Sequence, residues 1–138
     1  MIRTILVAAG AFYVGTGGYL LADPAQFYLQ IPGVSRTGAF NEHFLRDVGL
    51  AFLISGATLI YGAATAMGPL MLAGALWPAA HGLFHIQIWV AGGCAPDPTS
   101  LAELGSTAPP SLLALALAIA ANRRARLKTT TKLMQGVE

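Results

Sequence analysis

Four apolar stretches dominate this sequence, and they limit the chain to a small set of folds. They run over residues 2–22, 44–66, 69–92 and 107–122. A helix needs about 20 apolar residues to cross a bilayer. Hydrophobic residues make up 55% of the chain and charged residues 10%, whereas roughly a quarter of a soluble domain is charged. We therefore expect an all-α integral membrane four-helix bundle that occupies residues 1–138 as one transmembrane domain.

The distribution of Lys and Arg predicts how these spans are oriented. Cations resist translocation and collect on the cytoplasmic side of a membrane. Arg3 lies at the very start of the first stretch, and five cations follow the last one in a basic tail over residues 123–138: Arg123, Arg124, Arg126, Lys128 and Lys132. Four spans place both groups on one side, whereas an odd number would divide them. The chain is therefore predicted to be a multi-pass protein of a bacterial inner membrane, with both termini cytoplasmic and no nucleic-acid partner.

The two outward-facing links differ in character. Asp23-Pro24 ends the first stretch, and Phe27 and Tyr28 favour a membrane interface, so a short interfacial helix is expected over residues 25–31. The link over residues 93–106 is expected to be a loop. It carries Asp97 and Glu103 but no cation.

Ionisable residues occur in two short groups at or within the apolar stretches. Each one placed in a bilayer costs about 2.5 kcal/mol or more at the helix centre, and therefore needs an explanation. The first group contains Glu42 with Arg46 and His43 with Asp47, both four residues apart. The second group is His81 and His85, also four residues apart. Residues at this spacing share a helix face.

The depth of these residues suggests that the two groups meet. The second stretch runs inward from the outer surface, and the third returns to it. At about 1.5 Å per residue, Asp47 and His85 each lie roughly 10 Å below the outer boundary. His43 and His81 then lie about one turn above and below this layer. The leading interpretation is consequently a metal site formed by His43, Asp47, His81 and His85.

Imidazoles with a carboxylate suit a divalent transition metal such as Zn²⁺, Cu²⁺ or Fe²⁺. In that site Glu42 would act as a fifth ligand or base, and Arg46 would support the ligands. A haem held between histidines of facing helices is a further alternative. Cys94 is the single cysteine, which excludes an intrachain disulfide framework and a metal site built from several cysteines of this chain.

Two other classes of function stay open. The first is a membrane enzyme with Glu42, Asp47 and His85 as acid–base groups acting on a lipophilic substrate, for example an isomerase, a hydrolase or a quinone-linked oxidoreductase. The second is an accessory or scaffolding subunit, in which the polar groups only satisfy one another. The predicted partners are the lipid bilayer, a lipophilic small molecule, and a second copy or a larger membrane complex.

The chain also resembles the DoxX-like small membrane proteins and the domain-of-unknown-function families near them. The resemblance rests on residues 41–49 (NEHFLRDVG) and 81–85 (HGLFH), together with four short spans and cytoplasmic termini. It implies a four-helix inner-membrane bundle. Founding members are associated with quinone-linked sulfur oxidation, so a redox role is implied by analogy only. No residue string here transfers a catalytic role.

Overall fold

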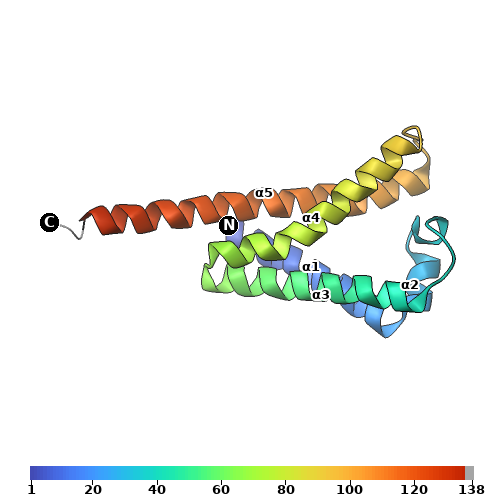
Figure 1. Cartoon of the computed structure of the whole chain (residues 1–138), viewed down its shortest axis with the longest axis horizontal. Coiled ribbons are helices and arrows are strands. Elements are labelled where there is room, and N and C mark those ends of the chain that lie inside the picture. Colours follow the sequence, from blue (N-terminus) through green and yellow to red (C-terminus); the bar gives the residue numbers. More distant parts are fainter. Residues whose placement is uncertain (136–138) are drawn as a thin grey trace.

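The fold is entirely helical over the part of the chain that the structure describes. The computed structural model describes residues 1–135, without the side chains of residues 128, 129 and 132–135. Four long helices and two short ones follow one another in the order α1 (Ile2–Ala22), α2 (Pro24–Gln30), η1 (Val34–Arg36), α3 (Glu42–Thr65), α4 (Gly68–Ala91) and α5 (Pro98–Gln135). Figure 1 shows the long helices running roughly along one axis.

Three of the helices are long and apolar enough to cross a membrane. They are α1, α3 and the Pro98–Leu127 part of α5, which confirms the prediction of a helical chain suited to a bilayer. The helix α4 is as long as α3, with 24 residues each. It is not among these three helices, and His81, His85 and Gln87 lie within it.

The helix α5 corrects the predicted boundary of the last span. The predicted loop over residues 93–106 is helical from Pro98 onward. Asp97 accepts hydrogen bonds from the backbone amides of Thr99 and Ser100 at 3.1 and 3.2 Å. These bonds satisfy amides that the first helical turn leaves free, and proline at the first position already has a helical φ.

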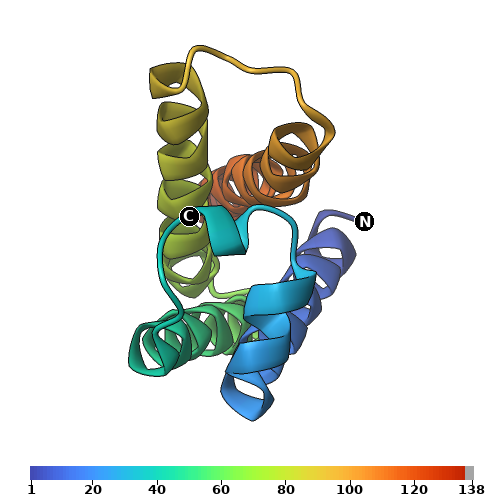
Figure 2. The same cartoon turned by 90° about the vertical axis from the view of Figure 1, so that its right-hand side faces the viewer.

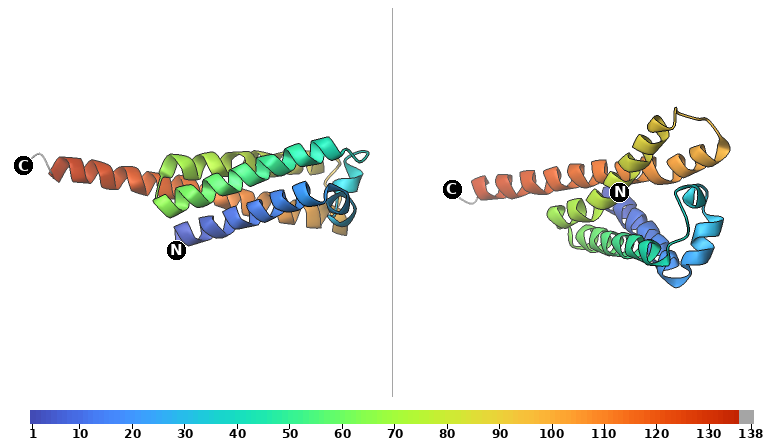
Figure 3. Two further views of the ribbon diagram at one scale, coloured as in Figure 1. Left: turned by 90° about the horizontal axis from the view of Figure 1, so that it is seen from below. Right: turned by 45° about the vertical axis from the view of Figure 1, so that its right-hand side comes forward.

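The same helix continues beyond the other helices at its far end. Residues 123–135 of the predicted basic tail are helical, and Figure 3 shows this extension projecting past the rest of the bundle. The last part of that tail, residues 136–138, lies outside the described residues.

One end of the bundle, here called the closed end, is tightly packed. It contains the turn between α3 and α4, where Ala66 adopts a left-handed φ of 60°. Gly10 packs on Gly56 and Ile60, and a Cβ built at Gly74 would lie 2.5 Å from the Leu59 amide nitrogen. Such small residues let helices approach closely where lipid removes the hydrophobic driving force. A buried core lies along this part of the bundle: Leu6, Tyr13, Leu59, Ala63, Met71, Ala75, Ala114 and Ala118.

At the opposite end, here called the open end, α1 and α3 stay closely packed at Gly17 and Gly49, but this pair separates from α4 and α5 (Figure 1). Figure 1 shows α3 and α4 close together at their connecting turn and farther apart toward the other end. A connecting segment, residues 31–41, is here called the strap and includes η1. Figure 2 shows the strap crossing the open end of the bundle. The predicted short helix in the first link is confirmed as α2, whose first turn is capped by Asp23 accepting from the Gln26 amide.

Candidate functional site

A large cavity occupies the open end, between the α1 and α3 side of the molecule and the α4 and α5 side. Its volume is about 1220 Å³, above the roughly 300–1,000 Å³ of ordinary small-molecule pockets. Aromatic and aliphatic side chains form much of its wall, and four of them are exposed: Phe12, Phe44, Phe84 and Ile88. The cavity can therefore be reached from an apolar surface.

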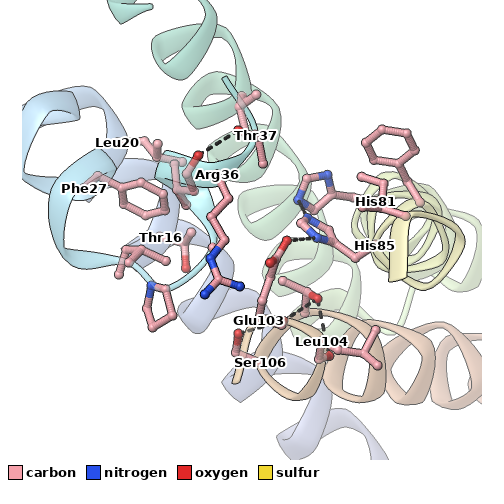
Figure 4. A pocket seen from close by; sticks show the side chains of 18 of the residues that line it. Thr16, Leu20, Phe27, Arg36, Thr37, His81, His85, Glu103, Leu104 and Ser106 are labelled. Carbon is pink, nitrogen blue, oxygen red and sulfur yellow. Dashed lines mark hydrogen bonds and ion pairs between the residues drawn. The ribbon is translucent and has the colours of Figure 1, made fainter. Parts of the chain in front are cut away.

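Three polar side chains in the wall form a hydrogen-bonded chain. His81 and His85 lie one turn apart on α4, with their Nε2 atoms 3.1 Å from each other. Nδ1 of His85 lies 2.7 Å from Oε1 of Glu103 on α5. The side chains of His85 and Glu103 are only 14% and 21% exposed. Figure 4 shows the two imidazoles and the carboxylate arranged in sequence along the cavity wall.

Aromatic neighbours hold the His81 ring in place. Trp77 stacks on it with a centroid distance of 5.0 Å and an interplanar angle of 12°. Phe52 of α3 meets both rings edge-on, at 5.5 Å from His81 and 4.8 Å from Trp77. The orientation of this imidazole is thus set by packing as well as by its hydrogen bond to His85.

The chemistry of the three groups fixes where their protons lie when Glu103 is ionised. A carboxylate only accepts hydrogen bonds, so Nδ1 of His85 must carry the hydrogen. In neutral His85, Nε2 is then an acceptor, and the donor must be Nε2 of His81. This leaves Nδ1 of His81 as the basic end of the chain. A carboxylate that orients an imidazole in this way is a recurring element of general-base sites.

The strap covers the Glu103 end of the hydrogen-bonded chain formed by His81, His85 and Glu103. Gly33 is buried at a φ of 89°, and a Cβ at this position would collide with the Glu103 carboxylate. Only glycine can adopt this φ without strain while lying so close to another group. The strap thereby limits the access of water to Glu103.

An ion pair links the strap to the start of α5. Nη1 of Arg36 lies 3.0 Å from Oδ1 of Asp97. Hydrogen bonds from the Ser100 side chain and amide, together with the Arg36 guanidinium, lower the pKa of Asp97 from 3.8 to about 2. Asp97 therefore joins the strap to the α4 and α5 side while also capping α5.

The predicted metal ligands fall into two separate pairs. The side chains of His43 and Asp47 are 90% and 59% exposed, and they contact each other at 3.5 Å. Neither lines the cavity, whereas His81 and His85 do. The reason is rotational: Leu45 faces the core, and residues two positions away are turned by about 200° around the helix. Equal depth was therefore not sufficient to bring the pairs together.

Within the described part of the chain, no group of three or more His, Cys, Asp or Glu side chains is arranged to hold a metal ion. The predicted four-residue metal site is thus not assembled. Binding of a metal or haem by His81 and His85 alone remains a prediction.

Glu42 also lies outside the cavity. It forms an ion pair with Arg46 at 2.9 Å, and Arg46 also donates to the Leu21 carbonyl. Among the predicted acid–base residues, His85 lines the cavity, whereas Glu42 and Asp47 do not.

Glu103 is the residue that sequence reasoning missed. The last apolar stretch begins near residue 107, which predicts that Glu103 lies in the loop over residues 93–106. The Asp-Pro pair at residues 97 and 98 carried the opposite signal, since an acidic cap followed by proline is typical of a helix start.

Comparison with known proteins found no match among family models, curated proteins or solved structures.

Proposed function

We propose that this chain is a four-span bacterial inner-membrane protein that binds a lipophilic small molecule and performs acid–base chemistry on it. The hydrogen-bonded chain of His81, His85 and Glu103 in the cavity wall carries this proposal. Both termini would be cytoplasmic, because Arg3 and the basic tail then share one side. In this topology α4 is the third span along the chain and is added to α1, α3 and α5, and the cavity opens toward the outer leaflet. Membership in the DoxX-like group remains part of the same proposal.

The shape and lining of the cavity favour an apolar ligand drawn from the bilayer. Phe44 on α3 and Phe84 on α4 both line the cavity, and more than half of each residue is exposed. In a membrane these side chains would face lipid, so a hydrophobic molecule could move sideways between them without crossing water. The strap would separate the same cavity from the outer aqueous phase.

The three polar groups would move a proton away from the ligand. Nδ1 of His81 takes a proton from the bound molecule, and Nε2 of His81 passes its own proton to Nε2 of His85. His81 returns to the neutral state, and His85 becomes an imidazolium ion beside the Glu103 carboxylate. The positive charge is thereby stabilised by an opposite charge at hydrogen-bond distance, which favours the charged form in a desolvated site. Return of the proton to another atom of the ligand completes an isomerisation.

The binding step can be tested with two glycines of α1. Cβ atoms at Gly15 and Gly18 would both meet open space, but only Gly15 lines the cavity. The Gly15→Phe side chain should fill part of the cavity, whereas Gly18→Phe adds the same ring elsewhere on the helix. Proteins purified from native membranes in mild detergent would be extracted, and retained small molecules quantified by mass spectrometry.

We expect wild type and Gly18→Phe to retain the same lipophilic compound, and Gly15→Phe to lose most of it. Equal retention by Gly15→Phe would show that the compound binds elsewhere. The absence of any retained compound from all three proteins would favour the scaffolding interpretation.

The proton positions can be tested by nitrogen-15 NMR of histidine-labelled protein. In wild type, His85 should be the Nδ1–H tautomer and His81 the Nε2–H tautomer. In Glu103→Ala the acceptor is gone, so His85 should change to a mixture of tautomers. An unchanged spectrum would contradict the assigned chain.

A further inference from the structure

The ring nitrogens that His81 and His85 turn toward each other have a second possible use beside the proposed proton transfer. Their Nε2 atoms lie 3.1 Å apart. Zinc binds imidazole nitrogen at about 2.0–2.1 Å, so an ion placed between these two atoms would have an N–Zn–N angle of roughly 100°. This angle is close to the tetrahedral geometry that zinc prefers. The two nitrogens are therefore spaced to share one ion.

The surroundings of the pair match those of histidines that bind metals. Such a histidine usually donates its other ring N–H to a carboxylate, which fixes the tautomer and orients the ring. Nδ1 of His85 lies 2.7 Å from Oε1 of Glu103, and this contact leaves the Nε2 lone pair of His85 directed at His81. Trp77 stacks on the His81 ring and limits its rotation. Both nitrogens are thus held in place before an ion arrives.

The cavity also provides a compensating charge and a route for an ion. His81 and His85 are partly exposed and line the cavity together with Glu103, whose ionised form would offset part of the charge of a cation. Gly92 and Ala95, exposed residues of the link between α4 and α5, line the same cavity. An ion from the outer aqueous phase could enter beside this link. Water would fill the remaining coordination positions, so we expect binding to be reversible.

We propose that Zn²⁺ binds to Nε2 of both His81 and His85 in place of the hydrogen they share, and that the bound ion stops proton transfer. The second part rests on the proposed function, because it describes regulation of the same site. The ion occupies both Nε2 lone pairs, so the hydrogen of His81 moves from Nε2 to Nδ1. Nδ1 then has no free lone pair and cannot accept a proton from the bound molecule. No net proton is released or taken up.

Binding can be measured on the full chain, without a polyhistidine tag, in nanodiscs of phosphatidylcholine. Zinc chloride is titrated calorimetrically, and magnesium chloride is the control ion because Mg²⁺ prefers oxygen ligands. The test variants are His85→Ala, which removes one ligand, and Glu103→Gln, which removes the charge beside the pair. His43→Ala is the matched control, since His43 and Asp47 form another pair at the same spacing but are exposed and lie outside the cavity.

We expect wild type and His43→Ala to bind one Zn²⁺ per chain with equal affinity, and neither to bind Mg²⁺. His85→Ala should lose this binding. Glu103→Gln should weaken it by about 10- to 100-fold, the usual effect of removing a group that orients a metal-binding histidine. Equal binding by wild type and His85→Ala, or loss of binding in His43→Ala, would overturn the zinc site.

A measurement on wild type alone covers the case in which a variant fails to fold. Nitrogen-15 NMR spectra of histidine-labelled protein are recorded before and after zinc is added. Zinc should convert His81 from the Nε2–H to the Nδ1–H tautomer and shift the Nε2 signals of both histidines. Unchanged signals would overturn the inference, although a zinc-free spectrum with the assigned tautomers would leave the proposed function intact. If the zinc-free spectrum lacks those tautomers, the proposed function fails and regulation by zinc fails with it.

Discussion

The two ends of this bundle are built from the same four long helices but are packed in different ways. At the closed end, glycine lies against the backbone of a neighbouring helix, as Gly74 does against Leu59. At the open end α1 and α3 remain in similar contact at Gly17 and Gly49, but this pair separates from α4 and α5 around a cavity of about 1220 Å³. The His81, His85 and Glu103 chain lies at this second end. Close packing holds the helices together at one end, and the space at the other gives the polar groups room beside a ligand.

The comparison also shows how each end satisfies its polar atoms. At the closed end Arg3 donates to the backbone carbonyls of Ala63 and Ala64, which the last turn of α3 leaves without helical partners. At the open end His81, His85 and Glu103 satisfy one another. The first arrangement completes a helix end, whereas the second creates a connected path for a proton.

The largest difference between the ends should appear when a methyl group is added to a glycine. Gly74→Ala would place a Cβ within 2.8 Å of three backbone atoms of α3, so we expect a destabilisation of about 1–3 kcal/mol. Gly15→Ala meets no atom within 4 Å and should stabilise its helix by about 0.5–1 kcal/mol. Unfolding in mixed micelles with increasing SDS measures both free energies. Equal effects would mean that Gly74 is not packed against α3 as closely as in this structure.

A second substitution tests how the strap supports the polar chain. Gly33→Ala and Gly38→Ala both place alanine at a positive φ, but only position 33 meets Glu103. Each should lose about 1–2 kcal/mol from backbone strain. Only Gly33→Ala should also displace the carboxylate and alter the nitrogen-15 signals of His85. If Gly38→Ala changes those signals equally, strain in the strap rather than direct contact is responsible.

The ion pair between the strap and α5 should give a smaller effect that depends on pH. The pKa of Asp97 is lowered from 3.8 to about 2, so its ionised form stabilises the folded strap above pH 3.8. This contribution is lost as the pH falls from 3.8 toward 2. Amide NMR signals of residues 33–37 should therefore stay constant from pH 7 to 4 and shift with a midpoint near 2.

Asp97→Asn is the companion variant for this titration. Its strap signals should already lie near the low-pH positions at pH 7, because the charge is absent. A wild-type midpoint close to 3.8, the ordinary value, would show that the bonds to Ser100 and Arg36 do not persist in solution.

The smallest effect is expected at His43 and Asp47, the pair that lies outside the cavity although the sequence predicts it at a similar depth. Replacing both His43 and Asp47 by alanine removes an exposed ion pair, and such pairs contribute about 0.2–1 kcal/mol at most. Ligand retention should equal that of wild type. If this variant loses as much ligand as Gly15→Phe does, His43 and Asp47 contribute to ligand binding.

Sequence reasoning succeeded where a property depends on position along one helix. The apolar stretches gave the long helices to within a few residues for α1, α3 and α4, because burial in lipid requires a continuous apolar run. The same reasoning identified His81 and His85 as residues that share a helix face. It failed at Glu103, because the apolar stretch begins near residue 107 and the start signal at Asp97 and Pro98 was not used.

The sequence by itself determined that the chain is helical and which ionisable residues lie within or beside its apolar stretches. Only the tertiary structure decided which of them face each other. Depth follows from counting residues at a fixed rise, but rotation around the helix axis depends on which face packs against a neighbour. Leu45 and Gly49 turn toward the core, and His43 and Asp47 consequently turn away. Glu103 reaches His85 because α5 begins early enough to pack beside α4.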